Sequence, residues 1–399
     1  MHLIETYALA TGSKIGKPFI FKKFFPIPFE KYITIQNSSG MQGKCYDYFQ
    51  EVIDFIFEDL EQAGYKIVQI GSKDDKPIKN ALHLQGQTNI NQTAFILENS
   101  KLHIGNDSFA IHMCSAFDIP LIGLYSVSSP EIAGPFWKNS KQICLTPDNW
   151  KPSFNPNENP KRVNEIKIEK IINSIQELIN ISSKNNIKTI FIGPKYKHGI
   201  LEVMPEQIVH NQFFQNHPLN IRYDFITNRE LEAKDYQGTI NNLNIRECAI
   251  VTDKVLAIEN FLQLKQKLSL VVYDITKSID TSFLEKLIFY GINTRCVFKN
   301  FEGSNEELLN RKESLIDFPQ IIEEINLPEF DKNLITEDCF YKTNKFFIAD
   351  NKIFLGRHGY LNNNPLQDSD KQNYQKINTE YLNDYITHDL EYSLIFKKD

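Results

Sequence analysis

The stretch that decides the fold is residues 101–125, Lys101-Leu-His-Ile-Gly-Asn-Asp107-Ser108-Phe-Ala-Ile-His112-Met-Cys-Ser-Ala-Phe-Asp-Ile-Pro120-Leu-Ile-Gly-Leu-Tyr125. Its pattern predicts a strand end, a tight Gly-Asn turn, a helix, a proline stop and a second apolar strand. Asp107 and Ser108 fall where the helix begins, so either side chain can cap its free N–H groups. A strand, a helix and a strand in this order indicate a parallel α/β sheet.

The same stretch is a candidate anion site. His112 follows Ser108 by four residues, so both lie on one face of the helix at its N-terminal end. A helix that begins at the carboxyl end of a strand is the usual place where an α/β protein holds a phosphate. The alternative is an ordinary capped helix with a packed histidine. These residues alone leave the two interpretations equally open.

The composition limits the class of protein. A chain of 399 residues predicts two domains with an appendage, and its net charge of -6 argues against a general nucleic-acid binder. The six cysteines are scattered without a C-x-x-C pair, which predicts neither a metal site nor a disulfide framework. The N-terminus lacks a secretory signal, and no apolar run reaches the roughly 18 residues that cross a bilayer. We therefore expect a cytoplasmic protein without a transmembrane segment.

The first thirty residues differ in composition from the rest of the chain. Residues 17–29 read Lys17-Pro-Phe-Ile-Phe-Lys-Lys-Phe-Phe-Pro-Ile-Pro-Phe29. The three prolines exclude a regular helix in this stretch. We predict that residues 1–31 form an extended segment that lays its aromatic side chains against the domain after it.

Strand and helix patterns alternate along both halves of the chain. This alternation predicts doubly wound parallel sheets in an α/β fold. We expect a first domain over residues 1–182, a second α/β domain over 183–330 and a C-terminal extension over 331–399. The strands expected in the first domain are 32–36, 66–70, 81–84, a strand that ends just before the Gly105-Asn106 turn, 121–125 and 142–145. Those expected in the second are 189–193, 199–203, 221–225, 248–252, 269–273 and 294–298.

Four loops of the first domain leave the carboxyl ends of successive strands, where the ligands of such sheets bind. Lys44 follows the first strand and precedes a helix, a position from which its ammonium can meet a phosphate. Taken singly, each of these residues also fits a solvated side chain or a plain turn. Their joint placement favours a ligand site. The loops carry Ser39 with Lys44, Gly71, Thr88, and Asp107 with Ser108.

Residues 32–180 resemble family 9 glycosyltransferases, the heptosyltransferase-like group, in their C-terminal nucleotide-sugar-binding half. The matching motifs are Tyr32-Ile-Thr-Ile-Gln-Asn-Ser-Ser with Lys44, Val68-Gln-Ile-Gly71, Gly86-Gln-Thr-Asn89 and Gly105-Asn-Asp107-Ser108-x-x-x-His112. The resemblance implies two Rossmann-like domains of the GT-B type. It also implies that a nucleotide-sugar binds as donor substrate rather than as a cofactor. The residues expected around this donor are Ser39, Lys44, Gly71, Thr88, Asp107, Ser108 and His112.

The resemblance implies a glycosyltransferase of the inverting kind, and it leaves the base that accepts the acceptor's proton unassigned. The expected reaction is hexosyl or heptosyl transfer to a glycan or lipopolysaccharide-type acceptor. Two features depart from the family: Phe109 replaces the usual glycine, and the second domain comes after the matched region. The alternative is a catalytically inactive glycosyltransferase-like binding or structural protein, and an epimerase ranks last. Candidate bases at strand ends, which also fit ordinary surface residues, are Glu202, His210, Asp224 and Asp253.

Overall fold

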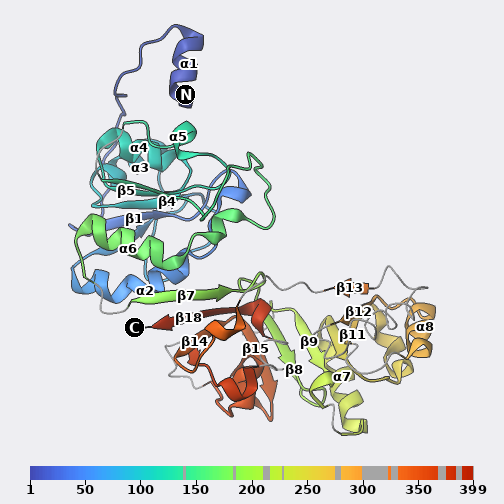
Figure 1. Cartoon of the computed structure of the whole chain (residues 1–399). Helices are drawn as coiled ribbons and strands as arrows, with labels where there is room; N and C mark the ends of the chain where they lie inside the picture. Colours follow the sequence, from blue (N-terminus) through green and yellow to red (C-terminus); the bar gives the residue numbers. More distant parts are fainter. Residues whose placement is uncertain are drawn as a thin grey trace. The chain divides into compact units, whose positions relative to one another are not determined.

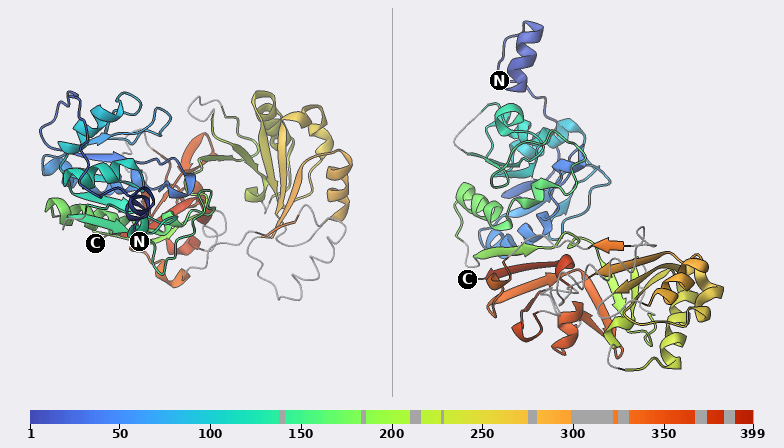
Figure 2. Two further views of the ribbon diagram at one scale, coloured as in Figure 1. Left: turned by 90° about the horizontal axis from the view of Figure 1, so that it is seen from above. Right: turned by 45° about the vertical axis from the view of Figure 1, so that its right-hand side comes forward.

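The computed structural model of the protein divides the chain into two compact units. One unit is Met1–Thr189 with the last two residues, and the other is Ile190–Lys397 (Figures 1 and 2). Each unit contains helices and largely parallel strands, which confirms the α/β class. The residues described are 1–137, 141–182, 186–209, 216–226, 229–274, 280–298, 322–324, 331–366, 374–382 and 389–398.

The first unit is built on a six-stranded sheet of order β3-β2-β1-β4-β5-β6, in which every neighbouring pair is parallel. This is the doubly wound order that the sequence predicts. Its direction reverses between β1 and β4, and ligands of such sheets bind at this point. The strands are β1 (Tyr32–Gln36), β2 (Lys66–Gln69), β3 (Leu82–His83), β4 (His103–Asn106), β5 (Leu121–Leu124) and β6 (Gln142–Leu145).

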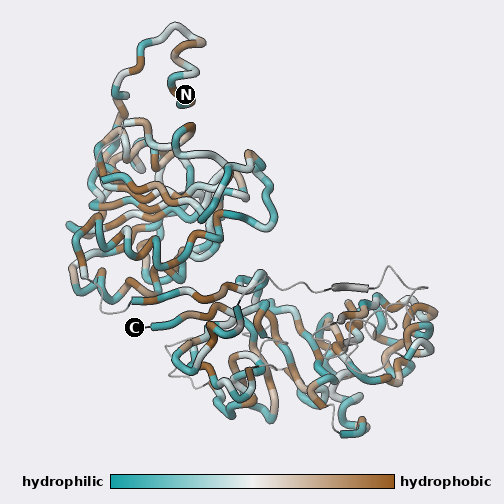
Figure 3. Tube along the Cα trace, viewed as in Figure 1, coloured by the Kyte–Doolittle hydropathy of each residue, from teal (hydrophilic) through white to brown (hydrophobic). Residues whose placement is uncertain are grey.

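The central strands are covered on both faces, as a parallel sheet requires. Every residue of β1, β4 and β5 is buried, and the strands form a hydrophobic layer in Figure 3. The α2 helix turns its apolar stripe inward, and Gly64, whose φ of +78° suits glycine, follows its end. The helices are α2 (Phe49–Gln62), α3 (Ile90–Glu98), α4 (Phe109–Phe117), α5 (Pro130–Ala133) and α6 (Ile168–Ile179).

The N-terminal segment corrects one expectation. Residues Leu3–Thr11 form helix α1 rather than extended chain, because the first proline comes only at position 18. Phe25 and Phe29 do pack against the core of the first unit, as expected. Phe24 is exposed but makes an edge-to-face ring contact with Phe95 on α3, at 5.3 Å between centroids. Phe19 and Phe21 are exposed, contrary to the expectation.

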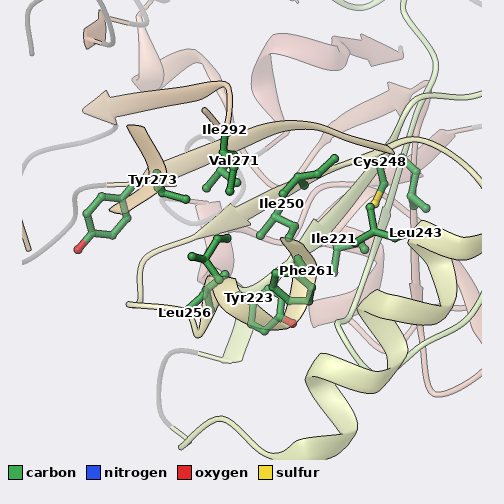
Figure 4. Packing of buried hydrophobic residues seen from close by; sticks show 14 of the residues in the cluster. Ile221, Tyr223, Leu243, Cys248, Ile250, Leu256, Phe261, Val271, Tyr273 and Ile292 are labelled. Atoms are coloured by element: carbon green, nitrogen blue, oxygen red, sulfur yellow. The ribbon is translucent and has the colours of Figure 1, made fainter. Parts of the chain in front are cut away.

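The second unit contains an eight-stranded sheet of order β13-β12-β11-β10-β9-β8-β15-β16. All neighbours are parallel except β15 and β16, which form an antiparallel hairpin at the edge. Figure 4 shows the buried cluster that packs between this sheet and its helices. The strands are β8 (Ile200–Val203), β9 (Leu219–Arg222), β10 (Cys248–Thr252), β11 (Leu268–Asp274), β12 (Thr294–Phe298), β13 (Ile322–Glu324), β15 (Lys345–Ala349) and β16 (Lys352–Leu355), and the helices are α7 (Ala233–Ile245), α8 (Thr281–Phe289) and α10 (Gly356–Leu361).

A smaller sheet has the order β17-β14-β18-β7. Its β14 pairs antiparallel with both β17 and β18. Across the described ranges, no helix combines the length and the apolar character needed to span a membrane. The strands are β7 (Ile187–Ile192), β14 (Cys339–Thr343), β17 (Tyr374–Lys376) and β18 (Ser393–Lys398).

Candidate functional site

The loops that follow β1 and β4 meet where the order of the first sheet reverses. Lys44 ends a short 3-10 helix (Gln42–Lys44) after β1, and Asp107 directly follows β4. The Lys44 Nζ lies 2.5 Å from Asp107 Oδ2, and the two side chains are only 16% and 6% exposed. Two residues that the sequence predicts for the site therefore form a largely buried ion pair at the expected edge of the sheet.

Two hydroxyl groups join this pair. Ser39 Oγ donates to the backbone oxygen of Asp107 at 3.4 Å. Ser128, in the loop after β5, donates to the Asp107 carboxylate. Asp107 thus ties together the loops after β1, β4 and β5. Ser128 is not among the residues predicted from the sequence, although it also lies in a loop that follows a strand of this sheet.

The expectation that the side chain of Asp107 or Ser108 caps helix α4 is wrong. Ser108 occupies the N-cap position, but its side chain makes no capping hydrogen bond. The Asp107 carboxylate is engaged by Lys44 and Ser128 instead. By contrast, Asn89 accepts two backbone N–H groups at the start of α3. The first turn of α4 therefore presents backbone N–H groups to which Ser108 gives no side-chain acceptor, and these suit an anion.

His112 lies half-buried on α4 near this ion pair. Burial lowers the pKa of His112 below its usual value, and Asp107 opposes this effect while His2 and Lys44 add to it. The imidazole is therefore neutral at pH 7. A neutral imidazole donates a hydrogen bond through one nitrogen without adding charge.

Gly71 and Thr88 are held by contacts within and around their own loops. Gly71 has φ +146°, and a Cβ there would lie 2.0 Å from Asp75 Oδ2. The same Asp75 oxygen accepts from Ser38 Oγ at 2.6 Å, so it links the loops after β1 and β2. Thr88 shares a hydrogen bond of 2.9 Å with Thr93 on α3. A role of Gly71 and Thr88 in nucleotide-sugar binding stays a prediction.

The long connection between β6 and α6 packs beside the site. The backbone oxygen of Pro156 accepts from Gly43 N at 2.8 Å, one residue before Lys44. The Trp150 indole donates to the Ser126 oxygen at 2.6 Å, two residues before Ser128. The sequence does not predict this packing, because the proline and asparagine content of the connection indicates only an irregular loop.

Buried polar atoms without hydrogen bonds gather at the same strand ends. In the described part of the chain, they include Gln36 Oε1 at the end of β1 and Asn106 Nδ2 at the end of β4. Asn106 uses its other side-chain atom to accept from Tyr46 N at 3.0 Å. Unsatisfied buried polar groups are uncommon and often mark functional sites.

Two of the candidate bases, Glu202 and Asp224, lie buried in ion pairs in the second unit. Arg222 Nη1 lies 2.5 Å from Glu202 Oε1, and its Nη2 lies 2.5 Å from Asp224 Oδ2. Glu202 and Asp224 are 1% and 5% exposed, so this ion pairing keeps both from acting as accessible bases. Asp253 is half-buried after β10, and His210 lies outside the described residues. No group of three or more His, Cys, Asp or Glu side chains suited to a metal ion occurs in the ranges that the structure covers.

Part of the chain is similar to known glycosyltransferases. Residues 15–163 match the sequence profile of glycosyltransferase family 9 (heptosyltransferase). Lipopolysaccharide heptosyltransferase 2 of Salmonella typhimurium is 29% identical over 99 residues, which are 22% of this chain and 28% of that protein. Lipooligosaccharide heptosyltransferase 2 of Haemophilus influenzae is 33% identical over 101 residues, which are 22% of this chain and 29% of that protein. The match thus spans less than a third of either relative.

Two solved glycosyltransferase structures are similar to part of the chain. The similarity to E. coli ADP-heptose lps heptosyltransferase II covers 39% of this chain and 48% of that chain, with 18% sequence identity and a TM-score of 0.32. A family 9 glycosyltransferase from Veillonella parvula covers 44% of this chain and 50% of its own, with 18% identity and a TM-score of 0.32. The family 9 (heptosyltransferase) match over residues 15–163 rests on the sequence profile, and this region contains the six-stranded sheet and the Lys44–Asp107 pair.

Proposed function

We propose that the protein is a glycosyltransferase that moves a sugar from a nucleotide-sugar to an acceptor hydroxyl. In this proposal the first unit binds the diphosphate of the donor through Lys44 and the start of α4. The observation that carries it is the buried Lys44–Asp107 ion pair at the reversal point of the sheet. The family 9 match over residues 15–163 supports it, because it includes both members of this pair.

The proposed reaction breaks the bond between the anomeric carbon and the phosphate oxygen of the donor. The nucleoside diphosphate leaves with the bonding electrons, and the acceptor oxygen forms the new bond while its proton passes to a base. An ammonium has three N–H donors, and Asp107 accepts one from Lys44, so further donors suit phosphate oxygens. The positive end of α4 also stabilises the charge that develops on the leaving group.

The acceptor and the sugar are proposed from the matched relatives. Their names describe heptose transfer to lipopolysaccharide or lipooligosaccharide. We therefore propose a heptose or hexose donor and a lipopolysaccharide-type glycan as acceptor. Direct displacement by the acceptor hydroxyl would invert the anomeric centre.

The first test measures donor binding to the Lys44→Ala variant. The probes are UDP-, GDP- and ADP-sugars, including the ADP-heptose that is bound to the heptosyltransferase TibC in its crystal structure. Because Trp150 donates to Ser126 beside the site, tryptophan fluorescence is a suitable readout. Loss of a charge-assisted contact to phosphate is expected to weaken binding by roughly 10- to 100-fold.

Two control variants test whether this loss of donor affinity comes from the Lys44 contact rather than from misfolding. Lys44→Arg keeps the charge and should retain part of the affinity, and Lys170→Ala removes a surface lysine that pairs with Asp148 and should retain all of it. If no nucleotide-sugar binds the native chain, the proposed donor site is wrong. If a donor binds but no nucleotide is released with any glycan acceptor, the inactive binding protein is the better interpretation.

A further inference from the structure

The N-terminal segment exposes an unusual amount of apolar surface. Phe19, Phe21 and Phe24 are 91%, 62% and 70% exposed. Tyr7 and Leu9 of α1 are 65% and 72% exposed. Single exposed apolar side chains are common, but a continuous set of large ones marks an interaction surface.

Helix α1 has little to hold it in water. None of its nine residues is buried. An isolated helix of this length is marginal in water, so a surface that covers its apolar side chains would stabilise it. His2, the residue before it, caps the helix and contacts Gly134 O through Nε2 at 2.9 Å, which tethers α1 to the first unit.

The same segment is strongly basic. Residues 14–31 contain five lysines and one glutamate, whereas the whole chain has a net charge of -6. The lysines alternate with the exposed phenylalanines, and no arginine is among them. The lysines are complementary to negative charge and the phenylalanines to an apolar layer, so the segment suits a surface that has negative charges above an apolar layer.

The segment is anchored where it meets the first unit. Lys23 N donates to Asn91 O at 3.0 Å, and Lys22 Nζ pairs with Glu98 at 2.5 Å. Phe25 and Phe29 then pack against the core of that unit. Phe24 also contacts Phe95 of α3, at 5.3 Å between ring centroids, so the chain from Lys22 onward is anchored to the first unit while its phenylalanine side chains stay largely exposed.

We propose that residues 1–24 are an interfacial segment that binds the surface of a bilayer containing anionic lipids. Phenylalanine and leucine side chains enter the boundary between headgroups and acyl chains, and lysines meet the anionic headgroups. Nucleic acid is a poorer partner, because it offers no apolar layer for Leu9 or Phe19. A second copy is also a poorer partner, because two such basic segments repel each other. This proposal is independent of the donor site.

The test is sedimentation of the full chain with vesicles of phosphatidylcholine alone or with about 30% phosphatidylglycerol. We expect the chain to bind the anionic vesicles more tightly than the neutral ones, by roughly fivefold in affinity for each lysine near the surface. High salt should remove this difference in affinity. Changing Phe19, Phe21 and Phe24 together to serine should weaken binding at least tenfold. Changing Lys14, Lys17 and Lys23 to glutamine should remove the preference for anionic vesicles.

The matched control changes three exposed apolar residues of the second unit to serine. Ile245, Val255 and Phe289 are 55%, 49% and 83% exposed, and this variant should bind vesicles like the native chain. The proposal is overturned if the native chain ignores anionic vesicles or if the control loses binding as much as the phenylalanine variant. It is also overturned if residues 1–24 mediate binding to single-stranded RNA or self-association while vesicles stay unbound.

Discussion

His103 is a buried histidine that the fold keeps neutral. It lies on β4 with no exposed surface, and burial lowers its pKa to about 3. Its Nδ1 lies 3.0 Å from Thr34 Oγ1 on β1, and that hydroxyl donates to Leu102 O at 3.3 Å. The ring therefore donates through Nδ1 to Thr34, and this bond joins β1 and β4, the two strands whose carboxyl ends lead into the candidate site.

This pKa predicts how acid destabilises the first unit. In the unfolded chain a histidine has a pKa of about 6.5, so between pH 6.5 and 3 the unfolded state binds a proton that folded His103 does not bind. The stabilising effect is therefore complete above pH 6.5 and is lost as the pH falls toward 3. The free energy of unfolding should drop by up to about 1.4 kcal/mol per pH unit in this window.

The variant His103→Gln should make that pH dependence shallower, because its amide can donate to Thr34 but does not titrate. Denaturant unfolding at several pH values, followed by tryptophan fluorescence, measures this slope. His83→Gln changes an exposed histidine of the same unit and should leave the slope unchanged. Equal slopes in the native chain and His103→Gln would contradict the burial effect.

Asp107 shows how far single residues of the site can be predicted. The sequence places Lys44 and Asp107 at one edge of a sheet, because both follow parallel strands. It does not predict that the two side chains pair, nor that Ser128 joins them. Capping is predicted from neighbours along the chain, whereas the Asp107 carboxylate is satisfied by residues 63 and 21 positions away.

At the level of elements, three neighbouring strands share a buried charged cluster. Glu202 lies on β8, Arg222 ends β9 and Lys345 begins β15. Lys345 Nζ lies 3.0 Å from Glu202 and 3.2 Å from Asp389. Burial favours the neutral form of Glu202, but the charges of Arg222 and Lys345 outweigh it and lower the Glu202 pKa. The cluster therefore stays ionised inside the second unit.

Removing one member of this cluster should be costly. Arg222→Met leaves Glu202 and Asp224 buried without their guanidinium partner, so we expect a loss of roughly 3–5 kcal/mol in the unfolding free energy of the second unit. Lys286→Met removes an exposed ion pair with Glu259, and it should change the unfolding free energy of the second unit by less than about 1 kcal/mol. Circular dichroism during urea unfolding measures both. If the two variants lose similar amounts of unfolding free energy, the buried cluster does not stabilise the second unit more than an exposed ion pair does.

The sequence anticipates strands better than it anticipates how they assemble. Apolar runs such as Cys248–Thr252 are predicted as strands and form them, because burial on both faces leaves a clear pattern. The pattern cannot show that Lys345–Ala349 pairs with Ile200–Val203, since this partner lies well over a hundred residues earlier. The apolar spacing of residues 254–267 predicts an α-helix, whereas the structure has a 3-10 helix at Ile258–Lys267.

On the scale of the whole molecule, the two units have separate cores. One cluster includes Val68, Ile96 and Leu121, and another includes Ile221, Ile250 and Val271. Domains with their own cores usually unfold as separate cooperative units. Both tryptophans of the chain, Trp137 and Trp150, belong to the first unit, so fluorescence reports on that unit alone.

This distribution of tryptophans predicts a selective effect of the donor. A nucleotide-sugar at about 100 times its dissociation constant should stabilise the first unit by roughly 2.7 kcal/mol, because it binds the folded form only. The unfolding transition seen by fluorescence should move to higher urea. The transition seen only by circular dichroism should stay in place, and Arg222→Met should move that one instead. If the donor moves both transitions equally, the two units do not unfold independently, and the prediction of a selective effect is wrong.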